Sequence, residues 1–261
     1  MHRVLGFALL MAAASMPAHA DNLLGVAPLR LILTDAKTSD LITLTNRSEG
    51  PHTYKLVTED QVMNAEGGIV QKDDFPYSAK RMLRFMPRTI KLEGGQRQNV
   101  RVMAIMPDGL ANGDYHTHLI FQEVNEEKPA GVSSTEGLKI AMGTLYNIGI
   151  PVVLQHGKIE SSLKLNAAEI GTKQDKPAVT IVVDRNGNGE AAGTIQVIDK
   201  ATQANVVQPD TVHIYHEADR VTLNLPVSPK VDIASLKGKP LEVRLLNDGK
   251  VLATLDVKGT F

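Results

Sequence analysis

Arg30 is the first residue whose position suggests chemistry, because it is a cation with no acidic residue immediately beside it. It precedes the apolar run 31–33 in the stretch APLRLILTDAKTSDLITLTN, residues 27–46. The alternation of apolar residues in this stretch predicts two β-strands joined by a short polar turn, as a hairpin. A lone arginine is most often a solvated surface charge, and the residues alone predict nothing more specific for Arg30.

Residues 184–190, DRNGNGE, match the opening of a calcium-binding loop, with Asp, Asn, Asn and Gly at its first, third, fifth and sixth positions. The twelfth position, which needs a glutamate that binds through both oxygens, is Ile195. The flanking segments have the pattern of strands, whereas such a loop lies between helices. A hairpin turn is therefore the favoured interpretation.

Two pairs of histidines are the other candidates for metal ligands. His116 and His118 are two residues apart, so they share one face of a strand. His213 and His216 fall on opposite faces if their segment is a strand. The sequence places no third ligand beside either pair. Surface or half-buried histidines are the favoured interpretation, and neither a metal nor any other cofactor is predicted.

The common motifs of enzymes are missing from the sequence. It has no G-x-S-x-G or H-E-x-x-H motif and no glycine-rich phosphate loop after a strand. The absence of cysteine excludes disulfides, thiolate metal sites and thiol chemistry. With 28 Lys and Arg against 29 Asp and Glu, no broad basic surface for nucleic acid is expected. We therefore expect a protein that is not an enzyme.

The first 20 residues have the pattern of a secretory signal peptide. A basic start is followed by an apolar stretch and by Ala-His-Ala at 18–20, a cleavage pattern ahead of Asp21. The apolar stretch is roughly a dozen residues long, which is too short for a membrane span of about 20. The mature protein is expected to begin at Asp21 and to function outside the cytoplasm.

Short runs of alternating apolar residues indicate that antiparallel β-sheets position these side chains. Helical patterns are nearly absent, so the expected fold class is all-β, with two sandwich domains at residues 21–155 and 156–261. Glycine-rich turns between the runs predict hairpins that need positive φ angles. These turns lie at 66–68, 93–95, 186–189 and 247–249. The expected strands cover residues 41–45, 52–59, 99–105, 115–124, 179–184, 193–198 and 241–246.

The segment IAMGTLYNIGIPVVL, residues 140–154, has two interpretations. The pattern alone favours an ordinary core strand, and the alternative is an edge strand that offers its apolar face to another protein. Pro151 favours an edge, because proline cannot donate a hydrogen bond within a ladder. The preceding residues 125–137 are expected to form a mobile loop. One face of the strand would carry Ile140, Met142, Thr144, Tyr146, Ile148 and Ile150.

Taken in order, these segments resemble the periplasmic pilus chaperones of the chaperone–usher pathway, the PapD-like family. The stretch from Arg30 to Thr45-Asn46 resembles the first strands of that family. MPRTIKLEGGQRQNVRV, residues 86–102, is similar to its segment of proline, apolar strand, glycine turn and arginine-bearing strand. GDYHTHLIF at 113–121 and IGIPVVLQHG at 148–157 resemble the last two strands of its first domain. The resemblance is strong over residues 24–157 and weaker over 158–261.

The resemblance implies a boomerang of two immunoglobulin-like sandwiches and a chaperone that lends a strand to pilus or fimbrial subunits that lack one. It implies the periplasm as the compartment, and subunits and an outer-membrane usher as the partners. It also leaves open whether the protein associates with itself through the exposed strand. The residues implied to enter the groove of the subunit are Ile140, Met142, Thr144, Tyr146 and Ile148.

In that family, an arginine at the position of Arg30 lies in the cleft between the domains and, with a lysine, binds the terminal carboxylate of the subunit. A guanidinium can bind a carboxylate through two parallel hydrogen bonds. The lysine position is Pro151 here, and a later arginine position is Gln155, which suggests an alternative or archaic branch. Either a second cation replaces the lysine or the anchor differs. The candidate cations are Arg88, Arg101 and Lys158.

A second hypothesis from a different class is a secreted β-sandwich adhesin or carbohydrate-binding protein. Sugar sites usually contain an aromatic platform, and the chain has no Trp, five Tyr and five Phe. This composition counts against the second hypothesis.

Overall fold

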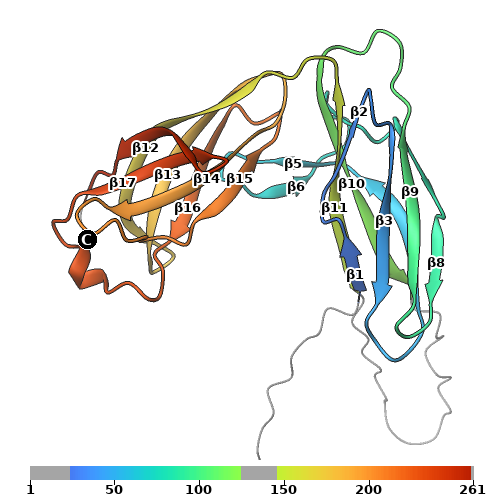
Figure 1. The fold of residues 1–261 in the computed structure, drawn as a ribbon, viewed down its shortest axis with the longest axis horizontal. Helices are drawn as coiled ribbons and strands as arrows, with labels where there is room; N and C mark the ends of the chain where they lie inside the picture. The colour runs from blue at the N-terminus through green and yellow to red at the C-terminus, as the bar shows by residue number, and fades with distance from the viewer. Residues whose placement is uncertain (1–23, 125–145, 260–261) are drawn as a thin grey trace, which may run out of the picture.

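The protein is described here from a computed structural model, in which residues 24–124 and 146–259 are placed. These residues contain eighteen β-strands and one 3-10 helix, η1 (Ile233–Leu236), so the all-β prediction is confirmed. Two sandwiches are inclined to each other and meet at one end, which gives a boomerang shape (Figure 1). Among the described residues, no helix has the length and apolar character needed to cross a membrane. The expected signal peptide and the loop 125–137 lie outside these residues.

The N-terminal sandwich is made of two sheets and a separate small hairpin. Its strands are β1 (Leu24–Ala27), β2 (Leu31–Thr34), β3 (Ser39–Asn46), β4 (His52–Glu59), β5 (Gln61–Met63), β6 (Ile69–Gln71), β7 (Leu83–Met86), β8 (Thr89–Leu92), β9 (Arg97–Ala104), β10 (Gly113–Val124) and β11 (Asn147–His156). One sheet has the order β1-β3-β9-β7, the other has the order β2-β11-β10-β4-β8, and β5 pairs with β6.

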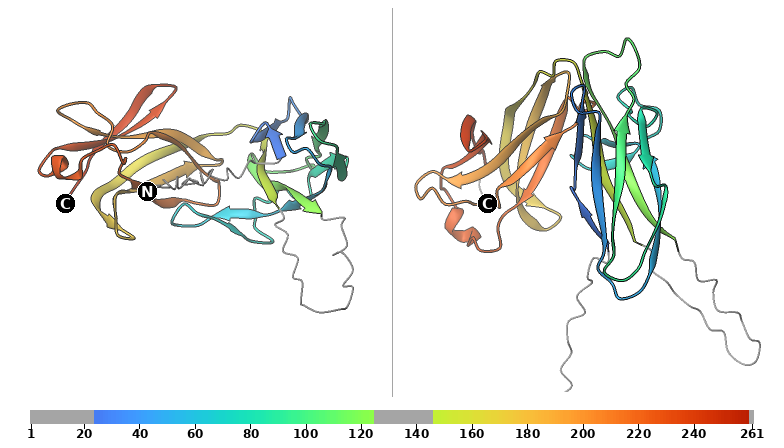
Figure 2. Two further views of the ribbon diagram at one scale, coloured as in Figure 1. Left: turned by 90° about the horizontal axis from the view of Figure 1, so that it is seen from below. Right: turned by 45° about the vertical axis from the view of Figure 1, so that its right-hand side comes forward.

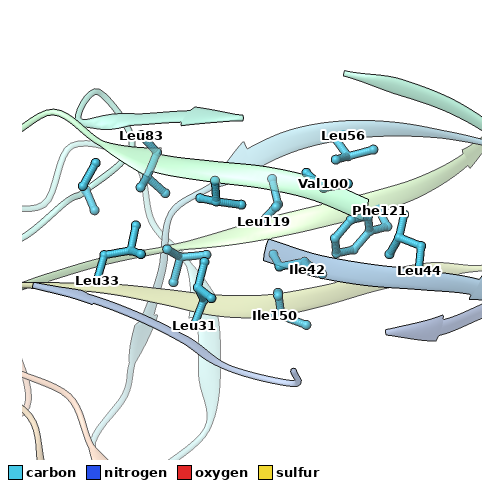
Figure 3. Packing of buried hydrophobic residues seen from close by; sticks show 14 of the residues in the cluster. Leu31, Leu33, Ile42, Leu44, Leu56, Leu83, Val100, Leu119, Phe121 and Ile150 are labelled. Carbon is cyan, nitrogen blue, oxygen red and sulfur yellow. The ribbon is translucent and has the colours of Figure 1, made fainter. Parts of the chain in front are cut away.

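Alternation along the strands buries one set of side chains between the two sheets. Leu31 and Leu33 from β2, Ile42 from β3 and Phe121 from β10 are each at most 1% exposed and lie in one cluster (Figure 3). β10 differs from the other strands, because its first nine residues are all buried. One face of β10 packs in this core, and the other carries His116 towards Tyr215 of the C-terminal sandwich.

The predicted hairpin within residues 27–46 is wrong, because its two strands belong to different sheets. β3 pairs antiparallel with β1, whereas β2 pairs in parallel with β11. The N-terminal segment therefore crosses from one sheet to the other between Ala27 and Leu31. Turn residues identify a change of direction, but they do not say which strand becomes the neighbour.

The C-terminal sandwich also has two sheets, with the orders β12-β13-β16 and β15-β14-β17-β18. Its buried apolar residues form a second core that includes Ile181, Ile195 and Val243. The turn 247–249 joins β17 to β18 as predicted, with φ of 47° at Asp248 and 76° at Gly249. The strands are β12 (Ser161–Lys173), β13 (Lys176–Gly187), β14 (Ala191–Asp199), β15 (Asp210–Ile214), β16 (Arg220–Pro226), β17 (Leu241–Asn247) and β18 (Lys250–Asp256).

The turn at 186–189 does not close a hairpin, which corrects the prediction for DRNGNGE. β13 and β14 lie in different sheets, so this segment is an arch between the two sheets of the sandwich. The turn at 93–95 is likewise an arch, because β8 pairs with β4 and β9 pairs with β3.

The β5–β6 hairpin projects from the N-terminal sandwich towards the C-terminal one (Figure 1, Figure 2). Met63 packs against the C-terminal core, and Thr222 N donates a hydrogen bond of 2.7 Å to Ala65 O. Thr222 lies on β16, which is an edge strand of its sheet. The hairpin therefore ties the two sandwiches together at this edge.

Candidate functional site

The site begins at an open edge of β11. β10 pairs antiparallel with the whole of β11, and β2 pairs with the opposite edge over Val152–Gln155. For residues 147–151, that opposite edge has no neighbouring strand within the described part of the chain. An open edge presents N–H and C=O groups that can pair with a strand of another chain.

Arg30 lies where this open edge ends. Leu31, the next residue, pairs with Val152, so Arg30 stands one position beyond the last pair between β2 and β11. Its side chain is 22% exposed and comes from a fixed strand end rather than from a long loop. The cation is therefore positioned at the junction of the open edge and the second sandwich.

The acidic partner of Arg30 is Glu190, in the arch between β13 and β14. Arg30 Nη2 donates a hydrogen bond to Glu190 Oε2, and the Arg30 guanidinium carbon lies 5.8 Å from the centre of the Tyr215 ring. At this distance a guanidinium and an aromatic face attract each other. The prediction of a lone solvated arginine is wrong, because the partner is 160 residues away in the sequence.

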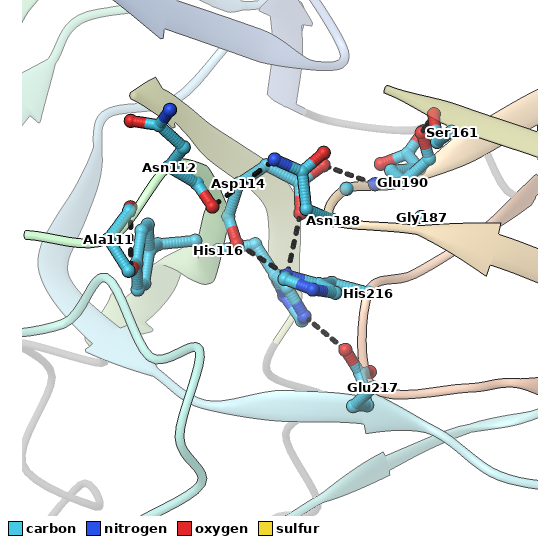
Figure 4. A network of polar contacts seen from close by, with 12 residues as sticks. Ala111, Asn112, Asp114, His116, Ser161, Gly187, Asn188, Glu190, His216 and Glu217 are labelled. Atoms are coloured by element: carbon cyan, nitrogen blue, oxygen red, sulfur yellow. Dashed lines mark hydrogen bonds and ion pairs between the residues drawn. The ribbon is translucent and has the colours of Figure 1, made fainter. Parts of the chain in front are cut away.

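Glu190 is held by contacts from both sandwiches. Its second carboxylate oxygen, Oε1, lies 2.5 Å from His213 Nδ1, and its backbone N–H donates to Asp114 Oδ2. Ser161 Oγ donates a hydrogen bond of 2.6 Å to the Glu190 carbonyl oxygen (Figure 4). Burial raises the pKa of the Asp114 carboxyl, and the Glu190 N–H opposes that shift.

The arch that carries Glu190 is shaped by Arg185, whose side chain is 4% exposed. Arg185 Nη1 donates hydrogen bonds of 2.8 Å to Gly187 O and 3.0 Å to Gly189 O. Gly187 has a φ of 108°, and a Cβ at this position would lie 1.8 Å from Glu160 O. Only glycine fits there, and the glycine-rich motif is explained by this geometry rather than by calcium.

The four histidines considered as metal ligands lie at the junction of the sandwiches. They are His116, His118, His213 and His216. His116 Nε2 is 2.9 Å from Glu217 Oε2, and His216 Nδ1 is 3.0 Å from Asp114 O (Figure 4). The reasoning for His213 and His216 assumed one strand, but β15 ends at Ile214, so alternation does not apply to His216. No group of metal-ligating side chains able to hold an ion is found among the described residues. His116 and His216 join the two sandwiches through these contacts.

His118 differs from the other histidines because its Nδ1 is buried and has no hydrogen-bond partner within the described residues. Its side chain lies on β10 directly opposite Pro151 of β11. Burial, helped by the positive charges of His116 and Arg30, lowers the pKa of His118 to about 4. Asp60 and Glu217 act in the opposite direction. The position across from Pro151 therefore holds a neutral imidazole at neutral pH.

We expect His118 to make the protein less stable in acid. In the unfolded chain His118 has a pKa of 6.5 and becomes protonated below about that pH. In the folded protein it stays neutral until the pH falls to about 4. The free energy of unfolding should fall by up to about 3 kcal/mol as the pH drops from 7 to 4. Urea unfolding across this range should show a smaller fall for His118→Gln. An equal fall in both proteins would contradict the assignment.

The described residues include only part of the strand that was predicted to enter the groove of a subunit. Ile140, Met142 and Thr144 lie outside the described residues, so their predicted role is untested. Tyr146 is 42% exposed just before β11, and Ile148 is half-buried against the N-terminal core.

The structure gives the surroundings of each of the three cations considered as a replacement for the lysine at Pro151. Arg88 lies over the Phe85 ring, Arg101 is exposed on β9, and Lys158 pairs with Glu160. Their role as a second cation beside Arg30 stays a prediction. The sequence did not predict the contacts of Glu190 and Tyr215 with Arg30. The only signal for such contacts was that Arg30 has no acidic residue beside it in the sequence.

Comparisons with known proteins find the fold but no sequence relative. No family model and no curated protein matches the chain. A chain of the CsuC–CsuE chaperone–tip adhesion subunit pre-assembly complex, from archaic chaperone-usher Csu pili of Acinetobacter baumannii, is 11% identical. The match covers 90% of this chain and 97% of that chain, with a TM-score of 0.50.

Two further solved structures match at a lower TM-score. A chain of the chaperone–tip adhesin complex of CFA/I fimbriae is 15% identical, with 89% and 96% coverage and a TM-score of 0.49. A chain of the Salmonella enterica SafA pilin in complex with the SafB chaperone is 12% identical, with 89% and 94% coverage and a TM-score of 0.48. The chain thus has the fold of two immunoglobulin-like sandwiches found in the CsuC–CsuE complex.

Proposed function

We propose that this protein is a periplasmic chaperone for pilus or fimbrial subunits. It would bind a subunit that lacks a strand, donate a strand to the incomplete sandwich, and deliver the subunit to an outer-membrane usher. The observation that carries the proposal is the open edge of β11 at residues 147–151, which ends at Arg30. The shared fold with the CsuC–CsuE complex is consistent with it.

The direction of the chain at this edge favours a carboxylate as the group that meets Arg30. β2 lies parallel to β11 and begins one residue after Arg30. A partner strand that runs along residues 147–151 in the same direction reaches Arg30 with its C-terminus. An antiparallel strand would bring a cationic N-terminus to the guanidinium instead, and two like charges repel each other. A parallel partner strand with a free C-terminus is therefore favoured.

The apolar side chains next to this edge suit an incomplete sandwich. Tyr146 is exposed, and Ile148 continues the face on which Ile150 packs in the N-terminal core. A subunit that lacks a strand exposes an apolar groove that promotes aggregation. Strand addition covers such a groove and adds main-chain hydrogen bonds. We expect binding to be the whole activity, with no cofactor or energy source.

We expect Arg30→Ala to abolish the recovery of the partner. The protein, purified from periplasm by a C-terminal tag, should carry a small β-rich subunit, identified by native mass spectrometry. Because a buried charged contact with the partner is worth about 2 kcal/mol or more, its loss should lower recovery at least about tenfold. Tyr146→Asp should have a similar effect, because it places a charge in the apolar groove.

Arg97→Ala is the matched control, since Arg97 is an exposed arginine on β9, in the other sheet. It should leave recovery unchanged. Thermal unfolding should show that the Tyr146→Asp variant is folded, because Tyr146 is 42% exposed and lies outside the cluster of buried core residues. Normal partner recovery with both Arg30→Ala and Tyr146→Asp would refute the proposed function.

A further inference from the structure

Glu190 has features of a ligand for Arg30 rather than of an incidental surface charge. Its side chain is 11% exposed, and its two carboxylate oxygens contact two different groups, Arg30 Nη2 and His213 Nδ1. The Arg30 guanidinium belongs to the N-terminal sandwich and His213 to the C-terminal one. The Glu190 carboxylate thus pairs with Arg30, the cation at the end of the open edge of β11.

The backbone around Glu190 fixes the carboxylate in this position. Asp114 accepts from its N–H, Ser161 donates to its carbonyl, and Arg185 holds the two preceding glycine carbonyls. Gly189 completes the fit, because a Cβ there would lie 2.7 Å from Ile159 and 3.1 Å from Asp114 Oδ2. Little conformational entropy remains to be lost when the ion pair forms, so the contact is preorganised.

We propose that Glu190 competes with the C-terminal carboxylate of the partner for binding to Arg30. In the protein without a partner, Glu190 neutralises Arg30, and an incoming C-terminal carboxylate must displace it to bind the guanidinium fully. Two carboxylates at one guanidinium repel each other, so simultaneous full binding is disfavoured. The inference rests on the proposed function, because it assumes that Arg30 binds the carboxylate of a subunit.

His213 makes the exchange feasible. It is 41% exposed and contacts Glu190 Oε1, the oxygen that Arg30 does not bind. After displacement, Glu190 keeps this neighbour and the hydrogen bonds of its backbone, so it is not left as an isolated buried charge. The competition would weaken the binding of a strand that ends in a carboxylate, because displacing Glu190 offsets part of the attraction to Arg30. Glu190 would thereby lower the affinity of the anchor for partners with a free C-terminus and make their release easier.

A pair of synthetic peptides tests the inference. Each has about ten alternating valine and threonine residues, the length of a long strand, with an acetylated N-terminus and a C-terminal tyrosine. One peptide ends in a free carboxylate and the other in an amide. The measured quantity is the ratio of the two affinities, by calorimetry or fluorescence anisotropy, for each protein. This ratio isolates the terminal carboxylate, because strand pairing is common to both peptides.

We expect Glu190→Gln to raise the ratio about tenfold over the wild-type value, because the internal negative charge is removed. Arg30→Gln should reduce the ratio to about one, because a neutral amide gives the carboxylate no ion pair. Glu160→Gln is the control for a change of net charge nearby, since Glu160 is an exposed carboxylate paired with Lys158. It should leave the ratio unchanged.

Two outcomes separate the inference from the function on which it rests. If Glu190→Gln leaves the ratio at the wild-type value while Arg30→Gln lowers it, the anchor exists but Glu190 does not compete for it. If the free acid binds no better than the amide in the wild type and in Glu190→Gln, Arg30 is not a carboxylate anchor, and the proposed function loses its main support together with the inference.

Discussion

Gly187→Ala should lower the free energy of unfolding by about 3 kcal/mol or more, the largest effect that we expect from a single methyl group in this protein. A Cβ at 187 would lie 1.8 Å from the carbonyl oxygen of Glu160, and the φ of 108° is itself unfavourable for alanine. The neighbouring atom is backbone, so it cannot rotate away. The arch must shift, and Glu190 shifts with it.

The measurement is urea unfolding of Gly187→Ala beside two control variants. Gly249→Ala has a positive φ of 76° but no atom within 4 Å of the new Cβ, so it should cost only about 1 kcal/mol. Gly171→Ala has neither problem and should be close to neutral. Equal losses for Gly187→Ala and Gly249→Ala would show that the close approach to Glu160 has no effect on stability.

Glu217→Ala should separate the two sandwiches at their histidine-rich junction. Glu217 accepts a 2.8 Å hydrogen bond from the backbone N–H of Met63 and contacts His116 at 2.9 Å. Burial acts to raise the pKa of Glu217, but the hydrogen bonds and the charge of His116 lower it overall, which favours its ionised form. Removal leaves two part-buried groups without an acceptor and should lower the free energy of unfolding by about 2–4 kcal/mol.

Hydrogen exchange gives a local measurement of this effect. The amides of Met63 and Thr222 should exchange faster in Glu217→Ala, because the β5–β6 hairpin is held against the C-terminal sandwich by fewer contacts. Glu217→Gln should recover part of the protection, since an amide oxygen can still accept from Met63. Glu66→Ala, an exposed acid in the turn of the same hairpin, is the control. Unchanged exchange at both amides would contradict the structural role of Glu217.

Alternation in the sequence was sufficient to predict where most strands lie, but not which strands pair. The run 52–59 coincides with β4 because its alternate residues face one core. The segment 27–46 gave the right strands and the wrong pairing. Strand β2 pairs with β11, and the partner of Leu31 is Val152, which no local pattern can indicate.

The candidate site shows the same limit. Arg30 was identified as an unusual cation, but its contacts with Glu190 and Tyr215 depend on how two separate sandwiches meet. The shared face of His116 and His118 was predicted correctly from their spacing, because that depends only on the period of a strand. That this face meets the second sandwich, rather than a metal ion or water, follows from tertiary packing, which the spacing does not contain.

The parallel pairing of β2 with β11 also sets the order of events when the chain folds. Leu31 pairs with Val152, so β2, the first strand of this sheet, cannot pair until β11, the last strand of the same sandwich, is available. Contacts of such high sequence separation slow folding, because a long loop must close before they form. During synthesis, the N-terminal sandwich would therefore remain incomplete until residue 155 has been added to the chain.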